Sequence, residues 1–518
     1  MPRSFTLLDA LVLVAYLGGT TALGIYIGRR QRDARDYFVA DRAIPWWAIL
    51  FSIVATETSA LTFISTPGLA YGTPAAPGNL TFLQLVAGYI VGRIAVAYTL
   101  LPRYYQGELV TAYALLERRF GLATRRFTSI VFMVTRALAD SVRVFATAIP
   151  VALIISPTAA DVTRVMPLAI LVLGALTVIY TYKGGMKAVV WTELLQASIY
   201  LLGGISALVL LGRAVPGGWG AILASASDTG RIRVIDTYAG IDRPYTLLAG
   251  VIGGAFLSMA SHGTDQLIVQ RLLSSRNLRD AQRAIIGSGF VVFAQFTLFL
   301  FIGLGLWAFY HGQPFAKTDE VFPQFIIQNM PVGLKGLIVA AIIAATMSTH
   351  SGAINSLAAA TTHDIYLPIS RRSADDPQTL RAGKLFALLW GVVLTAGALL
   401  FKQQGTPVVQ VALSIASFTY GGLLGGFFLG IFWRRSAQRD AIAGMAVGLT
   451  VMAFVVFAKQ IAAALPALGD ALGPLARVAF PWYVLIGTSI TMAVGIVSSL
   501  THPEPAEVPA AVPERVTP

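Results

Sequence analysis

Long apolar runs make up most of this chain, and they restrict its fold more than any other feature. Runs of about twenty or more predominantly apolar residues recur along the sequence and are separated by short polar segments. An α-helix of about twenty residues crosses the ~30 Å hydrocarbon core of a bilayer, whereas a membrane β-barrel would show alternating segments of about ten residues. The pattern therefore predicts an all-α polytopic membrane protein.

Composition excludes several classes of function. Hydrophobic residues make up 56% of the 518 residues and charged residues only 12%, against about 25% charged residues in soluble domains. The absence of cysteine excludes thiol chemistry, disulfides and Cys-ligated metals. The sequence also contains no HExxH motif, Cys/His metal set or Walker lysine loop. The chain is therefore not expected to be an enzyme or an ATP-driven pump.

We predict about thirteen membrane-spanning helices. They begin near Leu7, Pro45, Leu80, Phe127, Met166, Val189, Tyr245, Ala284, Gly333, Ala382, Val408, Ala441 and Trp482. The first run lacks the basic start and cleavage site of a signal peptide, so it is expected to remain as a membrane helix. A further short amphipathic segment is expected at Val321 to Met330.

The net charge of +13 indicates membrane topology rather than nucleic-acid binding. Most of the 38 basic residues fall in alternate loops, beginning with the loop after the first span, and Arg271 lies in one of these loops. Basic residues are enriched in cytoplasmic loops. We therefore expect the N-terminus outside, the C-terminus inside and a multi-pass protein of the plasma membrane, which in a bacterium is the inner membrane.

Two of the runs contain residues that interrupt helices at matching positions. The first, AILFSIVATETSALTFISTPGLAYG, is expected to break around residues 55–59 and again at Thr66-Pro67-Gly68, and the second, LLAGVIGGAFLSMASHGTDQLIVQ, around 258–265. The two runs start five spans apart, which gives the inverted repeat often seen in transporters; two unrelated Gly/Ser-rich helices are the alternative. The predicted parts are 1–36 (an extra helix and a basic loop), 37–213 and 214–435 (the two five-helix repeats), 436–500 (two further helices) and 501–518 (a disordered cytoplasmic tail).

The run AAIIAATMSTHSGAINSLAAATTHDIY carries the densest cluster of hydroxyls in a predicted span. Ser348 and Ser351 are three residues apart and share one helix face, with Thr349 between them in sequence. Hydroxyls, together with carbonyls freed at a helix break, can bind a hard cation such as sodium without a buried net charge. The alternative is that these hydroxyls bond back to the carbonyl four residues earlier.

Ionisable residues within spans are costly and are therefore candidates for function. Asp140 and Arg143 are three residues apart on one helix and are predicted to form an ion pair. Glu193 lies about one turn into its span, where an interfacial carboxylate and a functional one are equally expected. Asp265 is expected to cap a helix or to bond locally near the cytoplasmic end.

Several motifs, in order and spacing, resemble those of the sodium:solute symporter family, which includes bacterial proline, galactose and sialic acid symporters. They read RRQRDARDYFVADR, ATETSALTF, YKGGMKAVVWTELLQ, TDQLIVQRLLSSRNLRDAQRA, AATMSTHSGAINSLAAATTHDIY and SFTYGGLLGGFFLGIFWRR. Two segments, GGMKAVVWTE and INSLAAATTHDIY, are most similar to the iodide and monocarboxylate branch. The resemblance implies a LeuT-type fold of five plus five helices and alternating access coupled to sodium.

The resemblance also implies where ions bind. By motif, the sodium ligands map onto Ala55, Thr58, Ala345, Ser348 and Thr349. Some family members have a second sodium site, which would map onto Glu193, Ser348 and Ser351. That site lacks one expected hydroxyl, because Gly352 stands where a serine is expected.

The resemblance says less about which residues bind the solute. The candidates that could face the cavity are Glu57, Ser59, Thr62, Gln84, Ser258, Ser261, His262, Ser414 and Ser417. Glu57 could instead coordinate a cation or bond to backbone amides, and His262 could be a satisfied polar residue of the bundle. A lining that is moderately polar and carries few charges suits a small neutral solute or a monoanion better than a cation.

The sequence thus predicts a sodium-coupled symporter that imports a small organic solute, such as a sugar or a monocarboxylate, with Na⁺ as the coupling ion and no nucleic-acid partner. A monomer in the lipid bilayer is expected to be sufficient. The alternatives are a carrier of an inorganic or vitamin-like anion, a channel, a transport-inactive sensor and a membrane-embedded enzyme.

Overall fold

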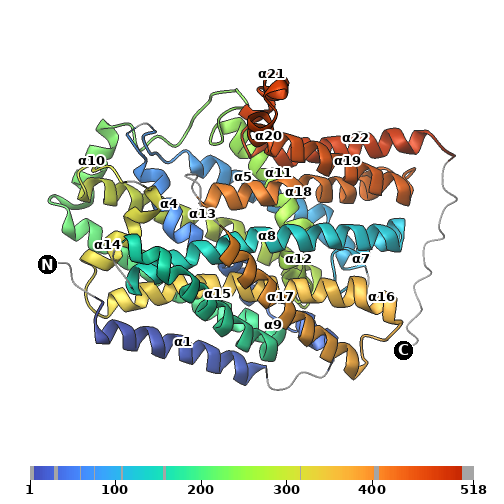
Figure 1. Ribbon diagram of the computed structural model, residues 1–518, viewed down its shortest axis with the longest axis horizontal. Helices are drawn as coiled ribbons and strands as arrows, with labels where there is room; N and C mark the ends of the chain where they lie inside the picture. The colour runs from blue at the N-terminus through green and yellow to red at the C-terminus, as the bar shows by residue number, and fades with distance from the viewer. Residues whose placement is uncertain are drawn as a thin grey trace.

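The computed structural model describes residues 5–28, 33–58, 60–74, 76–106, 109–155, 159–315, 317–401 and 408–503. These residues form a bundle of helices that run mostly along the long axis of the molecule (Figure 1). Within them, β-structure is limited to two isolated bridges. The all-α class predicted from the apolar runs is confirmed. The predicted tail lies mainly outside the described residues.

The first half of the chain contains ten α-helices. Their bounds are α1 Leu7–Ile27, α2 Ala34–Val39, α3 Trp46–Glu57, α4 Ala60–Tyr71, α5 Phe82–Thr99, α6 Leu101–Tyr104, α7 Ala114–Phe120, α8 Leu122–Ile155, α9 Ala159–Ala214 and α10 Gly218–Asp228. α9 is two helices joined directly at Gly185, whose φ of 59° and ψ of −165° are not helical. Glycine adopts this backbone conformation without the steric cost that a Cβ would add.

The second half contains twelve more α-helices and two π-helical segments. Their bounds are η2 Ala249–Gly253, α11 Gly254–Gly263, α12 Gln266–Leu273, α13 Leu278–Phe309, α14 Val321–Asn329, α15 Leu334–Ala360, η4 Thr361–Tyr366, α16 Leu367–Ser370, α17 Pro377–Leu400, α18 Val408–Phe432, α19 Gln438–Val456, α20 Ala458–Ala464, α21 Gly469–Leu472 and α22 Trp482–Leu500. α14 is the short amphipathic element expected from the sequence, and it buries Phe322 and Phe325.

Nine helices in the described part are long and apolar enough to cross a membrane, or ten if the bent pair α3 and α4 counts as one span. The sequence predicts about three more. The first falls on α8, which carries five buried or half-buried charged residues. The second falls on the first part of α9, where the apolar stretch Arg164–Ile179 is short, and the third on the pair α11 and α12, which is interrupted. The number of spans and their orientation therefore remain predictions.

Both predicted helix interruptions occur, with one correction. α3 ends at Glu57, and α4 leaves the break at 61° to α3. The second break predicted within this run, at Thr66-Pro67-Gly68, is wrong, because α4 continues through Pro67 to Tyr71. Proline removes one backbone donor, and surrounding helices can compensate for that loss. Here α13 packs directly on this turn, since a Cβ at Gly303 would lie 2.2 Å from the Pro67 carbonyl oxygen.

The second interruption lies where the sequence predicts it. α11 ends at Gly263, and Asp265 begins α12 by accepting a hydrogen bond from the Leu267 amide at 2.8 Å. Before it, α5 packs closely against η2, since a Cβ at Gly88 would lie 2.3 Å from the Gly250 carbonyl oxygen. The small residues of these helices therefore allow two backbones to approach closely, as is common in membranes.

The remaining helices surround these two interrupted elements. α1 lies along one side of the bundle, whereas α19 and α22 lie along the opposite side (Figure 1). The Asp9 carboxylate accepts hydrogen bonds from the Gly333 and Gly336 amides at 2.7 and 3.0 Å, which ties α1 to the start of α15. α15 is almost wholly buried within the bundle, and it carries the predicted hydroxyl cluster.

Candidate functional site

The first candidate site forms where α3 ends. The last four carbonyls of a helix have no partner within that helix. The backbone leaves the helical conformation at Thr58, whose ψ is 82°. The Val54 carbonyl accepts a hydrogen bond from the Thr58 amide at 2.8 Å, and the Thr56 carbonyl accepts one from the Thr349 hydroxyl at 3.3 Å. The break thus presents backbone oxygens toward α15.

A small cavity lies at this break, between α3, α9, α13 and α15. Its lining residues are Val54, Ala55, Thr58, Gln196, Ala197, Tyr200, Leu201, Gln295 and Ser348. The cavity has room for about one water-sized particle. None of the lining residues carries a charge, so the polar atoms available to a guest are uncharged oxygens and nitrogens.

Two oxygens at this cavity have no hydrogen-bond partner among the described residues. They are the Ser348 hydroxyl and the Gln196 amide oxygen, both from side chains that are at most 1% exposed. Buried polar atoms are usually satisfied, and an unsatisfied one calls for an explanation such as a missing ion or water. Although most of the lining is apolar, two unsatisfied oxygens in a cavity of this size are chemically suited to a small hard cation or a water molecule.

The structure brings together four of the five residues predicted to bind sodium. Ala55, Thr58 and Ser348 line the cavity, and Thr349 contacts the same helix end from α15. Ala345 lies in α15, one turn before Ser348, but its side chain is outside the described residues. The prediction that this set forms one site is therefore compatible with the geometry.

Sequence reasoning missed the glutamines of this site. The Thr58 hydroxyl donates to Oε1 of Gln295 on α13 at 2.8 Å. Gln196 on α9 lines the same cavity. Both are single polar residues inside long apolar runs. A polar side chain in a membrane span is costly unless it has hydrogen-bond partners. On this ground Gln196 and Gln295 could have been predicted as candidate site residues.

The predicted second sodium site has a different environment from the one expected. The Glu193 carboxylate, expected near the interface, is fully buried and forms an ion pair with Arg271, whose Nη2 lies 2.6 Å from Oε1. It also accepts hydrogen bonds from the hydroxyls of Ser52 and Thr56. Assigning Arg271 to a solvated loop was wrong, because its side chain is 0% exposed.

Two other positions of that second site, Ser351 and Gly352, are engaged or crowded. The Ser351 hydroxyl donates to the Ser348 carbonyl at 3.0 Å, three residues earlier rather than the four of the back-bonding alternative. A Cβ at Gly352 would lie 2.4 Å from Arg271 Nη2. The glycine therefore provides the space that the guanidinium occupies, so the missing serine and the buried arginine are explained together.

A second polar cluster joins the two interrupted helices. Glu57, at the end of α3, forms an ion pair with Arg93 of α5, and its Oε2 lies 3.5 Å from Nε2 of His262 on α11. Arg93 also donates to the Ser288 hydroxyl at 2.7 Å. Glu57 keeps a side-chain exposure of 17%, whereas Arg93 is fully buried. The cluster therefore offers a carboxylate, a guanidinium and an imidazole beside the first break.

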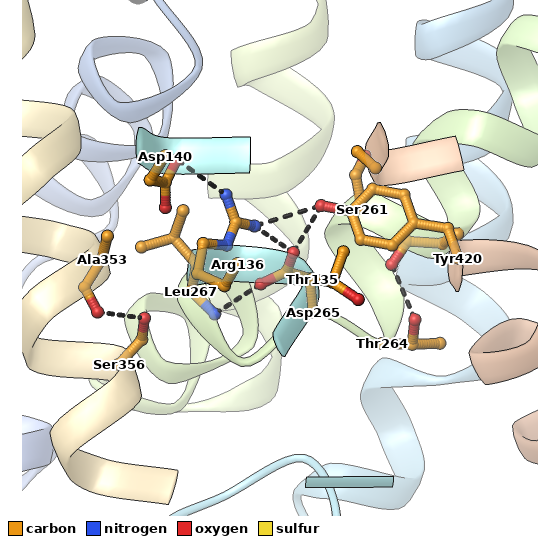
Figure 2. Close-up of polar contacts among 12 residues, drawn as sticks. Thr135, Arg136, Asp140, Ser261, Thr264, Asp265, Leu267, Ala353, Ser356 and Tyr420 are labelled. Carbon is orange, nitrogen blue, oxygen red and sulfur yellow. Dashed lines mark hydrogen bonds and ion pairs between the residues drawn. The ribbon is translucent and has the colours of Figure 1, made fainter. Parts of the chain in front are cut away.

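The second break is held by a network of its own. Asp265 forms an ion pair with Arg136 of α8 and accepts a hydrogen bond from the Tyr420 hydroxyl of α18. Figure 2 shows Arg136 between Asp265 and Asp140, and its Nη1 lies 3.5 Å from Asp140 Oδ1. Asp140 also pairs with Arg143 at 2.6 Å, which confirms the predicted pair. Asp265 thus caps α12, as expected, and also connects α8 with α18.

A further small cavity lies between α8 and α15. Asp140 and Arg143 line it from α8, and Thr346, Thr349 and His350 line it from α15. Both ring nitrogens of His350 and one carboxylate oxygen of Asp140 lack partners among the described residues, although the side chains are at most 2% exposed. This polar space, with room for about one water, lies on the side of α15 next to the sodium-candidate residues.

The predicted solute residues fall into two groups. Gln84 and Ser258 make bonds within the protein: the Gln84 amide contacts the Tyr245 carbonyl at 2.9 Å, and the Ser258 hydroxyl donates to the Tyr89 carbonyl at 3.0 Å. The others include Glu57 and His262, which belong to the cluster beside the first break, and Ser417, which is fully buried and whose hydroxyl has no described partner. Of this group, Thr62 is buried, Ser261 contacts His262 Nδ1 at 2.8 Å, and Ser414 is half-buried. Ser59 lies outside the described residues.

Comparison with known proteins identifies the family. The profile of the sodium:solute symporter family matches residues 37–448, which is most of the chain. The chain belongs to this family. It is 31% identical over 461 residues to the sodium/sialic acid symporter NanT of Aliivibrio fischeri, covering 88% of each protein. It is also 27% identical over 475 residues to human sodium-coupled monocarboxylate transporter 1, covering 89% of this chain and 75% of that protein.

A solved structure of another family protein has the same architecture. The outward-open, substrate-bound Na⁺-coupled sialic acid symporter superposes with a TM-score of 0.82 at 26% identity, covering 97% of this chain and 99% of that one. This sodium:solute symporter is therefore a multi-pass membrane transporter that couples solute movement to sodium. The family and its relatives are transporters rather than enzymes.

Proposed function

We propose that this symporter binds one sodium ion in the cavity at the α3 break and co-transports it with one small organic monoanion. The proposed ligands are Ala55, Thr58, Ala345, Ser348 and Thr349. One observation carries the proposal: a cavity of single-ion size lies between the end of α3, at Ala55 and Thr58, and the unpartnered Ser348 hydroxyl. An ion there would join α3 to α15, so its binding would favour conformations in which the two helices are close.

We assign no ion to Glu193. Its carboxylate has four contacts, two from Arg271 and two from hydroxyls, and the pair is fully shielded from solvent. A sodium ion bound to Glu193, Ser348 and Ser351 would lie beside the guanidinium of Arg271 and would be repelled by it. The arginine thus supplies a permanent positive charge at this place, which supports a ratio of one sodium per solute.

The proposed solute is a small organic monoanion, such as a monocarboxylate or a sugar acid. Relatives of this chain include carriers of sialic acid and of monocarboxylates, which are anionic carboxylates. The cluster of Glu57, Arg93 and His262 lies beside the first break, where a solute could contact both interrupted helices. The further proposed contacts are Ser59, Thr62, Ser261, Ser414 and Ser417. A small inorganic anion is the second candidate, because a human sodium/iodide cotransporter is 27% identical over 448 residues.

The proposed mechanism is alternating access within an inverted repeat. The repeats are residues 37–213 and 214–435, in a chain of thirteen spans with its N-terminus outside that functions as a monomer. One sodium and one monoanion carry no net charge, so import is driven by the sodium gradient alone. A tenfold gradient supplies about 1.4 kcal/mol per ion. A second sodium would instead make accumulation depend on membrane potential, by about 2.3 kcal/mol per 100 mV.

Uptake into proteoliposomes tests this function. A panel of monocarboxylates, sugar acids, neutral sugars and iodide is offered with an inward sodium gradient or an equal potassium gradient. We expect saturable uptake of one anion with sodium only, a Hill coefficient of one for sodium, and no response to an imposed membrane potential. Sodium-independent uptake would contradict the coupling, whereas a Hill coefficient near two would contradict the single ion.

A further inference from the structure

A basic pocket lies outside the cavities described above, on elements that also contact the second break, since the Tyr104 hydroxyl of α6 donates to the Gly263 carbonyl at 2.6 Å. It is formed by α6, α7 and the last turns of α18, and its volume is about 230 Å³. The lining residues are Arg103, Gln106, Leu115, Leu116, Arg118, Arg119, Phe427, Gly430 and Ile431. This volume is below the roughly 300–1,000 Å³ of pockets that enclose drug-sized ligands, so the pocket suits a small charged group rather than a whole organic ligand.

The charge of the pocket is not compensated within the described part of the chain. Arg103 and Arg119 are half-buried and Arg118 is exposed, and none of the three forms an ion pair with a described carboxylate. The buried arginines Arg93, Arg136 and Arg271 each do. The Arg118 guanidinium donates to the Gln106 carbonyl at 2.9 Å and is otherwise exposed. The three guanidinium groups therefore create a positive potential at the pocket that favours an anion.

Arg119 has a separate, structural role. It donates to the carbonyls of Gly430 and Arg434 at 3.3 and 2.6 Å, and so satisfies the C-terminal end of α18. Carbonyls at a helix C-terminus carry partial negative charge, which Arg119 partly offsets. Arg103 and Arg118 are the two residues that keep their donors available to a ligand.

The floor of the pocket is apolar. Phe427 and Leu116 are at most 2% exposed beneath the arginines, and Ile431 lies beside them on α18. The next residue, Phe432, exposes 59% of its side chain at the end of this membrane helix. The apolar surface beside the pocket is thus formed by the last turn of α18, where Phe428 and Ile431 are half-buried and Phe432 is exposed, so an occupant with both a charged and an apolar part fits better than a purely polar anion.

We propose that this pocket binds the phosphate group of an anionic phospholipid, with Arg103 and Arg118 on the phosphate and the start of an acyl chain against the apolar last turn of α18, at Phe432. Arginine binds phosphate through paired N–H donors, and basic pockets at the ends of membrane helices bind anionic headgroups. A soluble phosphate ester shares the charged part of this chemistry but not the apolar part. Because the pocket joins α6 and α7 to α18, an occupant would stabilise the contact between them.

The test uses the full-length protein, purified and delipidated, with phosphatidylglycerol or phosphatidylcholine added in mixed micelles. Thermal unfolding is followed as lipid is titrated, because a ligand that binds the folded state raises its stability. We compare wild type with Arg103→Gln/Arg118→Gln. The matched control is Arg276→Gln/Arg279→Gln, which removes the same charge from two exposed arginines; their segment is near, since Tyr105 donates to the Leu272 carbonyl.

Phosphatidylglycerol should stabilise wild type and the control variant, and phosphatidylcholine should not. The half-saturating phosphatidylglycerol concentration should rise about fivefold for each arginine removed, or about 25-fold in the double variant. An equal response of the double variant and the control, or equal stabilisation by the two lipids, would overturn the proposal. Size-exclusion profiles and sodium-dependent unfolding confirm that each variant is folded.

A separate arm distinguishes the source of the phosphate. Inorganic phosphate and glycerol 3-phosphate are titrated at constant ionic strength without lipid. We expect neither to stabilise wild type at concentrations where the lipid does. Stabilisation by either one that is lost in Arg103→Gln/Arg118→Gln would overturn the lipid as the occupant and assign the pocket to a soluble phosphate.

Discussion

Replacing both Ser348 and Thr349 by alanine should raise the sodium concentration for half-maximal uptake at least about tenfold, which corresponds to about 1.4 kcal/mol of sodium binding. The Ser348 hydroxyl lines the cavity and lacks a described partner, and the Thr349 hydroxyl contacts the Thr56 carbonyl at the break. Removing both takes two oxygens from the proposed coordination sphere and leaves the backbone carbonyls in place. Solute affinity at saturating sodium should change much less.

The control for this variant is Ser356→Ala on the same helix. Ser356 is fully buried and its hydroxyl donates to the Ala353 carbonyl at 3.0 Å. The Ser356→Ala protein therefore loses one local hydrogen bond but no oxygen of the sodium cavity. Its sodium dependence should match that of wild type. Unchanged sodium dependence in a folded Ser348→Ala/Thr349→Ala protein would rule out this set as the sodium site.

Arg271→Met should strongly destabilise the protein. The guanidinium donates to the Glu193 carboxylate, the Ser52 hydroxyl at 3.1 Å and the Leu267 carbonyl at 2.5 Å, with no exposure to solvent. Removing one member of a buried ion pair leaves an unpaired charge and costs about 3–5 kcal/mol. Thermal unfolding and the folded fraction after size-exclusion chromatography measure this loss.

The companion variant Glu193→Gln/Arg271→Met should recover most of the lost stability, because it removes both charges together. A solvent-accessible pair provides the matched comparison: Arg372 and Asp376 lie 2.9 Å apart with side chains 36% and 28% exposed. Exposed pairs contribute about 0–1 kcal/mol, so Arg372→Gln should unfold close to wild type. Wild-type stability of Arg271→Met, or a double variant no better than the single one, would contradict the described pair.

Local sequence signals predicted much of the fold. The apolar runs predicted the helices, because each run is long enough to satisfy its backbone hydrogen bonds within one segment. The break before α12 was predicted because Gly263 ends one helix and Asp265 caps the next. The cluster of hydroxyls on α15 was predicted from helical spacing, and it lies beside the first break.

Features that depend on contacts distant in sequence could not be predicted. α4 continues through Pro67 because α13 packs on it, and no local pattern records that contact. Glu193 and Arg271 are 78 positions apart in sequence, so no local pattern predicts that they pair. The distribution of basic residues among the loops instead assigned Arg271 to a cytoplasmic loop. The reason for a glycine at position 352 can be seen only when the position of the Arg271 guanidinium is known.

Equilibrium binding of radioactive sodium to the purified protein tests the central claim most directly. In choline buffer, without solute, we predict saturable binding of one sodium ion per chain that excess potassium does not displace and that Ser348→Ala/Thr349→Ala weakens at least about tenfold. Binding that does not saturate, or that persists unchanged in the folded double variant, would contradict sodium binding at the α3 break.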